Sequence, residues 1–399
     1  MTRHALSGPR RRNVLRGALA ASALLVTTAV APAMEEGTIT IWMSADKGAK
    51  QLEAVAARFT EELGIPVVIE SPEPIPDKFP QAAATGDGPD VVLWAHDRFG
   101  EWAASGLLAP IDMGADVRAE LPEIAIDAVT FNGETWAWPI SLEAVALIYN
   151  KALIDTPPAS FEEIADLKID GAGSIMWDYN NTYFTMPLMA ANGGFAFEKV
   201  DGRYDGKATG VNNEGALKGA QVLRDLIDGG TMPRGVDYGI MDTAMNKGEV
   251  AMMISGPWAW ANLDQSSIDY GVAPLPTVGG SPAKPFVGVY AAAVNAASPN
   301  KDLVKELMEG YLLTDEGLAA WNEAGSLGAL ADASMAETQG ADERIAATVE
   351  AAKAGVPMPS NPEMGKFWSA MEPALAAITN GEQDVKTALD GAADRILAE

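Results

Sequence analysis

Short apolar runs alternate with an amphipathic segment in the first quarter of the chain. Leu52, Val55, Phe59 and Leu63 recur at the spacing of one helical face. The apolar runs around this segment are short enough to be buried strands. Alternation of strands and helices predicts an α/β fold. The strands predicted here are residues 38–42 ("TITIW"), 65–70 ("IPVVIE") and 90–94 ("DVVLW").

A hairpin interrupts this alternation. Asn132 and Gly133 form the dipeptide favoured in two-residue turns, between "VTF" and "TWAW". Further on, Ser160 and Glu163 predict a capping box at a helix start. The middle of the chain is predicted to contain strands at 146–150, 174–177, 250–254, 270–275 and 286–294, and helices at 183–192 and 213–227.

The last third of the chain has only helical periodicity. Ser298 and Pro299 predict a helix start, as cap and first-turn residue. Thr314 predicts another cap. The closing helix repeats apolar residues at Val385, Leu389, Ala392 and Ile396.

The length of 399 residues predicts two domains. The hydrophobic fraction of 48% is ample for two cores. No internal repeat or low-complexity linker divides the chain. We therefore expect the chain to pass between two lobes several times through ordered strands that act as a hinge.

Residues 1–33 have the composition of an export signal. They hold five arginines and no acid, followed by an apolar run over 18–31 that is too short to span a membrane. Ala31-Pro32-Ala33 fits a signal-peptidase site, so we expect cleavage after Ala33 and a periplasmic protein. The stretch "RRNVLR" (11–16) resembles a twin-arginine signal. An ordinary secretory signal and an uncleaved anchor are the alternatives.

The charge balance narrows the class of partner. The formal net charge is −27, and removal of the five leader arginines lowers it to −32. Such a surface repels phosphate backbones and anionic lipid heads, so we expect neither nucleic-acid binding nor membrane insertion. The chain has no cysteine, and its histidines are His4 and His96. We therefore expect no histidine-based metal site and no cofactor.

Aromatic and charged residues follow three predicted strands. Trp42 precedes Asp46-Lys47, Trp94 precedes Asp97-Arg98, and the third strand leads into "SGPWAW" with Trp258 and Trp260. Ligands bind beyond the carboxyl ends of strands in open α/β sheets. Aspartate and arginine can hold neighbouring hydroxyls, and an aromatic ring can cover the CH face of a sugar. Together they predict a site for an uncharged sugar.

Simpler structural roles exist for the charged residues and for His96. Asp46-Lys47 could form a solvated turn, and Asp97 and Arg98 could cap or pair locally at a helix start. His96 fits a hydrogen-bonded structural residue better than a catalyst. The neighbouring bases Lys47 and Arg98 should lower the pKa of Asp46 and of Asp97.

For three tryptophans and one glutamate the sequence also predicts whether the side chain is buried. Trp258 and Trp260 cannot face the same way, so one should pack in the core. Trp368 has the spacing of a helical core face. Glu143 stands at the head of an apolar strand, where a buried acid needs a partner.

From residue 35 to its end, the chain resembles the periplasmic maltose/maltodextrin-binding proteins of ABC sugar importers. The resemblance implies a two-lobed periplasmic-binding-protein fold of type II, closing over a gluco-oligosaccharide without chemistry on it. The segments that carry it are "AATGDGPD" (83–90), "WAHDRFG" (94–100), "LIYNKALI" (147–154), "GPWAWAN" (256–262), "KPFVGV" (284–289), "NAASPNK" (295–301) and "YLLTDEGL" (311–318).

The resemblance also implies site residues. Five stand where the family hydrogen-bonds sugar hydroxyls: Asp46, Lys47, Asp97, Arg98 and Glu143. Four stand where it stacks rings on glucosyl units: Tyr183, Trp258, Trp94 and Trp368. This chain has different residues from the family at five positions: Asn181, Ser369, Glu372, Pro76 and Ser44. It is also slightly shorter than the family around 167–173.

The predicted lobes are discontinuous in sequence. We expect an N-terminal lobe from 34–141 and 291–342, and a C-terminal lobe from 142–290 and 343–399. Hinge crossings are expected near 142–145, 287–291 and 338–343. The predicted function is capture of maltose, malto-oligosaccharide or a related glucoside by a monomer that delivers it to importer membrane subunits. A same-fold protein for another disaccharide or polyol, and a secreted glycosidase, are the alternatives.

Overall fold

The computed structural model describes residues 34–200 and 203–398, and it contains two separate main sheets. The larger sheet has the strand order β15-β7-β14-β3-β1-β2, with β4 and β16 also paired to β14. The bounds of its strands are β1 (Ile39–Trp42), β2 (Val67–Glu70), β3 (Val91–Ala95), β4 (Leu108–Ala109), β7 (Ala137–Glu143), β14 (Phe286–Asn295), β15 (Ala329–Leu330) and β16 (Val356–Pro357).

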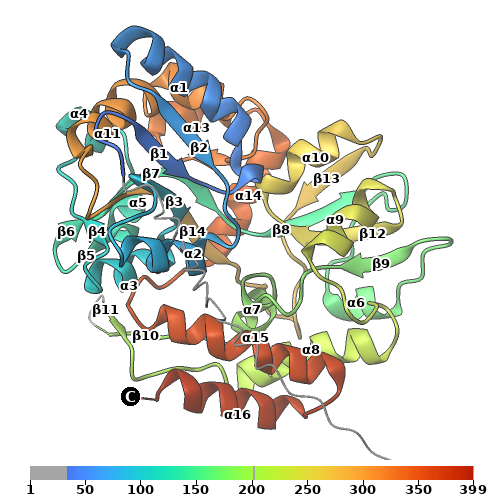
Figure 1. The fold of residues 1–399 in the computed structure, drawn as a ribbon. Coiled ribbons are helices and arrows are strands. Elements are labelled where there is room, and N and C mark those ends of the chain that lie inside the picture. The colour runs from blue at the N-terminus through green and yellow to red at the C-terminus, as the bar shows by residue number, and fades with distance from the viewer. Residues whose placement is uncertain (1–33, 201–202, 399) are drawn as a thin grey trace, which may run out of the picture. The chain divides into compact units, whose positions relative to one another are not determined.

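The smaller sheet has the order β13-β8-β12-β9. It comprises β8 (Ala146–Asn150), β9 (Gly173–Met176), β12 (Val250–Ser255) and β13 (Tyr270–Ala273). Figure 1 shows the two sheets on opposite sides of the described region. Two small hairpins complete the strands: β5 (Thr130–Phe131) with β6 (Glu134–Thr135), and β10 (Glu198–Val200) with β11 (Arg203–Asp205).

Each sheet has its own hydrophobic core. Helices that pack on the larger sheet bury Leu52, Phe59, Phe79, Trp102 and Trp321 against it. The helices in sequence around the larger sheet are α1 (Ala49–Leu63), α2 (Ile75–Ala83), α3 (Phe99–Ala104), α4 (Ala115–Ala119), α5 (Glu123–Ala128), α11 (Lys301–Leu307), α12 (Asp315–Trp321) and α13 (Ala333–Gln339).

The helices around the smaller sheet contribute to one extended core cluster. Among them, α7, α8, α15 and α16 pack against one another, at the bottom of the view in Figure 1. The bounds are α6 (Phe161–Asp166), α7 (Thr182–Ala191), α8 (Glu214–Asp228), α9 (Tyr238–Asn246), α10 (Trp260–Gln265), α14 (Glu343–Ala354), α15 (Met364–Asn380) and α16 (Val385–Ile396).

Most local predictions are confirmed. Asn132 and Gly133 have positive φ values of 54° and 82°, which a turn between β5 and β6 of this length requires. The Ser160 side chain accepts a hydrogen bond from the Glu163 backbone N–H, and Thr314 caps α12 in the same way. The α16 positions Val385, Leu389, Ala392 and Ile396 are all buried.

Leu63 has the spacing of the buried face of α1 but is 46% exposed, because it is the last residue of the helix. One local prediction is wrong. The helix predicted to start at Ser298 begins at Lys301, after Asn300. The Ser298 hydroxyl donates instead to the buried Asp90 carboxylate at 2.6 Å, which ties this loop to the start of β3.

Strand β14 is the centre of the larger sheet. All ten of its residues are buried, and it pairs with β3 on one side and β7 on the other. Between its pairs Tyr290↔Ser141 and Ala291↔Pro139 the register shifts, which leaves Ile140 as an extra residue on β7. Pro139 cannot donate to a ladder, so an irregularity there is expected. The bulge lies beside Tyr290, whose side chain reaches the functional site described below.

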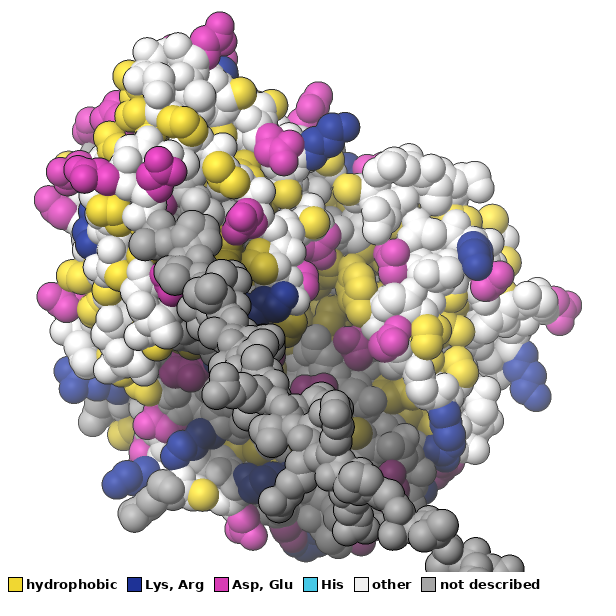
Figure 2. Space-filling view, viewed as in Figure 1, with side chains coloured by type: hydrophobic (Ala, Val, Ile, Leu, Met, Phe, Trp, Pro, Cys, Tyr) yellow, Lys and Arg dark blue, Asp and Glu magenta, His cyan; other side chains and the backbone are white. Residues whose placement is uncertain are grey.

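The charged surface agrees with the composition. Acidic side chains are scattered over the visible face, with basic ones between them (Figure 2). The predicted export signal over 1–33 lies outside the described residues. No helix among residues 34–200 and 203–398 has both the length and the apolar character to cross a membrane.

Candidate functional site

A cavity of about 790 Å³, which we call the cleft, is lined by residues attached to both sheets. Turns after β1 and β3 contribute from the larger sheet, and α7, α9, α15 and the turn after β12 contribute from the smaller one. This volume is within the range of ligand pockets. All nine residues predicted to bind sugar line the cleft: Asp46, Lys47, Trp94, Asp97, Arg98, Glu143, Tyr183, Trp258 and Trp368.

The turn after β1 directs Lys47 into the cleft. Gly48 closes this turn with φ 75°, and a Cβ there would lie 3.0 Å from the Trp321 carbonyl oxygen. The Trp321 indole donates to the Lys47 carbonyl at 3.0 Å. Left-handed backbone and close packing therefore both require glycine at position 48.

Lys47 and Glu143 form a buried ion pair. Lys47 is 9% exposed and Glu143 5%. Burial raises the pKa of Glu143, and the Lys47 ammonium acts against this rise. The same ammonium lies 4.2 Å from the Trp258 ring centroid, a cation–π distance. The prediction that Glu143 needs a partner is confirmed, and a solvated turn is the wrong description for Lys47.

Asp97 is buried at the end of β3 and faces α15. The Trp368 indole donates to its carboxylate at 2.7 Å. Burial raises the pKa of Asp97 to about 7, although the Arg98 charge and the Trp368 hydrogen bond both lower it. Burial likewise raises the pKa of Asp46 more than Lys47 lowers it. The prediction that neighbouring bases lower both pKa values is therefore wrong, because desolvation is the larger effect.

Arg98 has a local partner. Its guanidinium pairs with Glu101 at 3.0 Å, three residues further along the chain. This is the local pairing that the sequence allowed as an alternative to ligand contact. Since the side chain also lines the cleft, the pair fixes the guanidinium at the cleft wall.

His96 has the structural role predicted for it. Its Nδ1 accepts a hydrogen bond from the Val289 backbone N–H at 2.9 Å, and its Nε2 lies 2.9 Å from the Met358 carbonyl oxygen. These bonds connect the end of β3 to β14 and to the segment after β16. Burial lowers the pKa of His96 to about 4, so the ring is neutral at neutral pH.

We expect His96→Ala to lower the free energy of unfolding by about 2 to 4 kcal/mol near neutral pH, since two buried backbone groups lose their partner. The unfolded-state pKa of about 6.5 exceeds the folded value, so the wild type loses stability as the pH falls from about 6.5 towards 4. Urea unfolding at two pH values should therefore show a smaller gap between variant and wild type under acidic conditions. A gap independent of pH would contradict this assignment.

Aromatic rings form one wall of the cleft. Tyr183 and Phe184 lie with ring centroids 6.1 and 6.2 Å from that of Trp258. Trp260 points the other way and is buried in the core, as its spacing from Trp258 predicts. Trp368 lines the cleft rather than the core alone.

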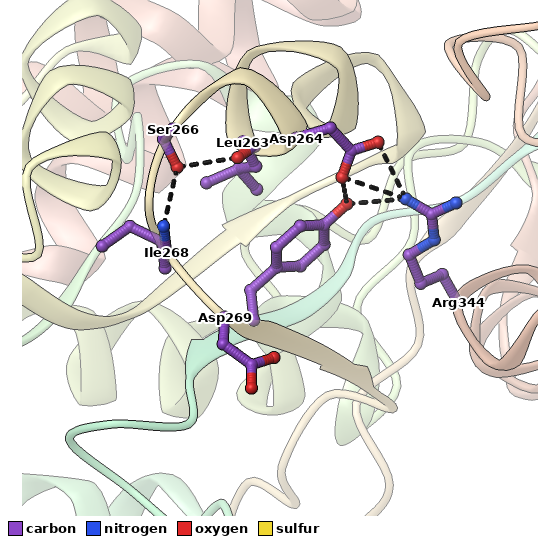
Figure 3. A pocket seen from close by; sticks show the side chains of 7 residues that line it. Leu263, Asp264, Ser266, Ile268, Asp269 and Arg344 are labelled. Atoms are coloured by element: carbon purple, nitrogen blue, oxygen red, sulfur yellow. Dashed lines mark hydrogen bonds and ion pairs between the residues drawn. The ribbon is translucent and has the colours of Figure 1, made fainter.

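A second, more open pocket lies beside β13 and α14 (Figure 3). Arg344 lines it, paired with Asp264 at 3.1 Å and Asp342 at 2.7 Å. The Tyr270 hydroxyl accepts from Arg344 and donates to Asp264. Arg344, Asp264, Asp342 and Tyr270 therefore satisfy one another.

The profile of a family described as bacterial extracellular solute-binding protein matches residues 45–319. This is more than half of the chain, and it includes strands of both sheets.

The chain belongs to this family.

Several proteins of known name are similar to this chain over most of their length. A galactooligosaccharide-binding protein of Bacillus subtilis is 29% identical, over 89% of this chain and 88% of the relative. A maltotriose-binding protein of Pyrococcus abyssi is 26% identical, over 79% and 71%. A maltooligosaccharide ABC transporter solute-binding lipoprotein of Streptococcus pneumoniae serotype 4 is 26% identical, over 95% and 94%.

The family adopts the two-lobed type II periplasmic-binding fold, and the two sheets of this chain are its two lobes. Strand β7 belongs to the larger sheet and the next strand, β8, to the smaller one, with residues 144–145 between them. The lobe boundaries given above stay a prediction.

The five positions that depart from the sugar-binding pattern line the same cleft of this solute-binding protein. Asn181 caps α7 by accepting from the Tyr183 backbone N–H. The Ser369 hydroxyl donates to the Gly365 carbonyl, one turn back on α15. The Ser44 hydroxyl donates to Glu73 at 2.5 Å. Pro76 and Glu372 are the other two of these five positions.

Sequence reasoning missed several cleft residues of this solute-binding protein. Tyr290 is 2% exposed, and its hydroxyl has no hydrogen-bond partner among the described residues. Asp178, Phe184 and Tyr238 also line the cleft. A signal existed for Tyr290, the only residue with a polar side chain in the apolar run 286–294. Within the part of the chain that the structure describes, no group of three or more His, Cys, Asp or Glu side chains could hold a metal ion.

Proposed function

We propose that this chain is the substrate-binding protein of an ABC importer for maltose, a malto-oligosaccharide or a related glucoside. The observation that carries the proposal is the cleft itself. It combines the carboxylates Asp46 and Asp97 with the rings Trp258 and Trp368. Carboxylates bind sugar hydroxyls, and rings cover sugar CH faces.

Contacts between the lobes support a clamp mechanism. Asp97 follows β3 of the larger sheet, yet its carboxylate bonds to Trp368 of α15. Lys47 follows β1 and lies over the ring of Trp258, which follows β12. A sugar that touches both sets of residues stabilises the closed form, since opening would remove half of its contacts.

The proposed binding is of micromolar strength. Hydrogen bonds to charged groups contribute about 1.5 to 3 kcal/mol each, and stacked rings add to them. After the ordering cost of association, a net value of about −8 kcal/mol corresponds to a micromolar dissociation constant. The closed form would then dock on the membrane subunits as a monomer, after export of the chain by the twin-arginine route to the periplasm.

Calorimetry with a panel of glucosides tests this proposal. We expect saturable binding of at least one of maltose, maltotriose and trehalose, with a matching change in tryptophan fluorescence because Trp94, Trp258 and Trp368 line the cleft. Galactose-containing oligosaccharides belong in the same panel, given the relative from Bacillus subtilis. A flat response to every saccharide would rule out the proposed function.

One observation favours a glycosidase as second candidate. Asp97 has a pKa of about 7, and a glycosidase acid needs a raised pKa. The hydrogen bond from Trp368 occupies one oxygen of this carboxylate, and the family consists of solute-binding proteins. We therefore propose that the chain does not hydrolyse its ligand. Incubation with maltotriose should yield no shorter sugar over many hours.

A further inference from the structure

The cleft has far more acidic than basic side chains. Its lining includes seven acids and two bases. Both bases are already paired, Lys47 with Glu143 and Arg98 with Glu101. The five other acids form no ion pair with any residue of 34–200 or 203–398: Asp46, Asp77, Asp97, Asp178 and Glu372.

A neutral sugar leaves this charge uncompensated. Hydroxyl groups can donate hydrogen bonds to carboxylates, but they bring no positive charge. Burial, together with the charges of Asp237 and Glu372, raises the pKa of Asp178 to about 6 against the opposing effect of hydrogen bonds from Asn181. The cleft therefore disfavours the ionised forms of Asp46, Asp97 and Asp178, and a bound cation would stabilise them.

Lys47 shows how this cleft accommodates an ammonium group. Its charge is neutralised by the Glu143 carboxylate and lies over the faces of Trp258 at 4.2 Å and Tyr290 at 5.2 Å. A carboxylate beside an aromatic face is a favourable environment for an ammonium ion. Asp178 and Glu372 also line the cleft and have no such cation beside them among residues 34–200 and 203–398.

One residue that lines the cleft has an unpartnered hydroxyl. Thr182 lines the cleft at the start of α7, next to Asn181, and is 2% exposed. Its hydroxyl has no hydrogen-bond partner among the described residues. A buried hydroxyl without a partner costs free energy, so a ligand group that donates to it would remove that cost. An ammonium N–H is such a donor.

A metal ion does not fit this arrangement. In the described ranges no three acidic or histidine side chains converge closely enough to hold one. The acids are instead distributed along the cleft wall, where they suit a cation carried on a larger molecule.

Resting on the proposed function, we infer that the preferred ligand is an amino sugar, a di- or trisaccharide whose protonated amine lies between Asp178 and Glu372. The rings of Tyr183, Trp258 and Trp368 cover its sugar faces, and the Thr182 hydroxyl accepts from the amine.

The test compares sugars that differ only in charge. Maltose, trehalose, cellobiose and lactose are each titrated beside their 2-amino-2-deoxy derivative and its N-acetylated form, by calorimetry near pH 6.5, where the amine is protonated. We expect at least one amine to bind about tenfold or more tighter than both neutral counterparts. Raising NaCl from about 20 to 200 mM should reduce this preference, since salt screens the attraction.

Substitutions at Asp178 and Glu372 test whether these two acids cause the preference for an amino sugar. Glu372 is exposed on α15, so Glu372→Gln and Glu372→Lys should fold normally. The ratio of amine to neutral affinity should fall in the order wild type, Gln, Lys, and Asp178→Asn should lower it independently. Glu61→Gln removes an exposed acid of α1 outside the cleft and should leave the ratio unchanged.

The outcomes separate the two proposals. Binding of neutral sugars without preference for an amine would overturn this inference and leave the proposed function standing. An amine preference that survives both Glu372→Lys and Asp178→Asn would also overturn it. If spermidine binds and no sugar does, both proposals fail.

Discussion

Trp258→Ala is expected to weaken saccharide binding by roughly 30- to 1000-fold, because a buried aromatic residue at the centre of a binding site contributes about 2 to 4 kcal/mol. The ring is only 8% exposed and packs against Tyr183 and Phe184. It also lies under the Lys47 ammonium, so its loss removes one wall of the cleft and uncovers a buried charge. Calorimetry with the tightest sugar of the panel measures the effect.

Two further variants separate lost contact from lost stability. Trp258→Phe retains a ring and should bind within roughly tenfold of the wild type. Trp136→Ala removes a buried indole that donates to the Phe131 carbonyl and does not line the cleft. It should lower the melting temperature and leave the affinity unchanged. A Trp258→Ala protein that binds within threefold of the wild type would exclude this ring from the site.

Asp97→Asn is expected to raise stability at alkaline pH while it weakens ligand binding. Folding raises the pKa of Asp97 from about 3.8 to about 7. The folded wild type therefore retains a proton that the unfolded chain loses, and its stability falls as the pH rises from about 4 to about 7. Above that window the full cost of burying the ionised carboxylate is present.

The expected gain of Asp97→Asn is a few kcal/mol at most, since one pKa unit corresponds to about 1.4 kcal/mol. Asparagine can still accept the hydrogen bond from the Trp368 indole. The melting temperature of the unliganded variant should exceed that of the wild type near pH 8, and the two should converge near pH 4. Other titrating groups are common to both proteins and cancel in the difference.

Asp155→Asn controls for the loss of one charge, because Asp155 is exposed and lies outside the cleft. Its melting temperature should follow the wild type at every pH. If Asp97→Asn melts below the wild type near pH 8, the carboxylate is not destabilising and its burial has another basis.

The local elements of the fold follow from the sequence. Helix caps at Ser160 and Thr314 and the turn at Asn132 depend on a few neighbouring residues, so pattern and propensity suffice to predict them. The start of α11 was predicted wrongly because Ser298 is bound by Asp90, 208 residues away. No local pattern contains such a contact.

The residues that line the cleft were predicted better than their electrostatics. All nine predicted residues line one cleft. Turns after β1, β3 and β12 carry Asp46, Lys47, Asp97, Arg98 and Trp258 there, whereas Tyr183 on α7 and Trp368 on α15 were named from the family resemblance alone. The pKa values of Asp46 and Asp97 were predicted in the wrong direction, since the neighbouring bases are visible in the sequence and burial is not. Tyr290 was missed because a strand residue can face either side of a sheet.

The position of β14 between β3 and β7 determines when the larger sheet can assemble. Its first residue, Phe286, lies more than two-thirds of the way along the chain, and until it is synthesised β3 and β7 each have an open edge. A chain that stalls on the ribosome or is truncated before that point exposes two edges able to pair with other molecules. Such fragments should aggregate or be degraded, which makes completion of translation a precondition for folding of this lobe.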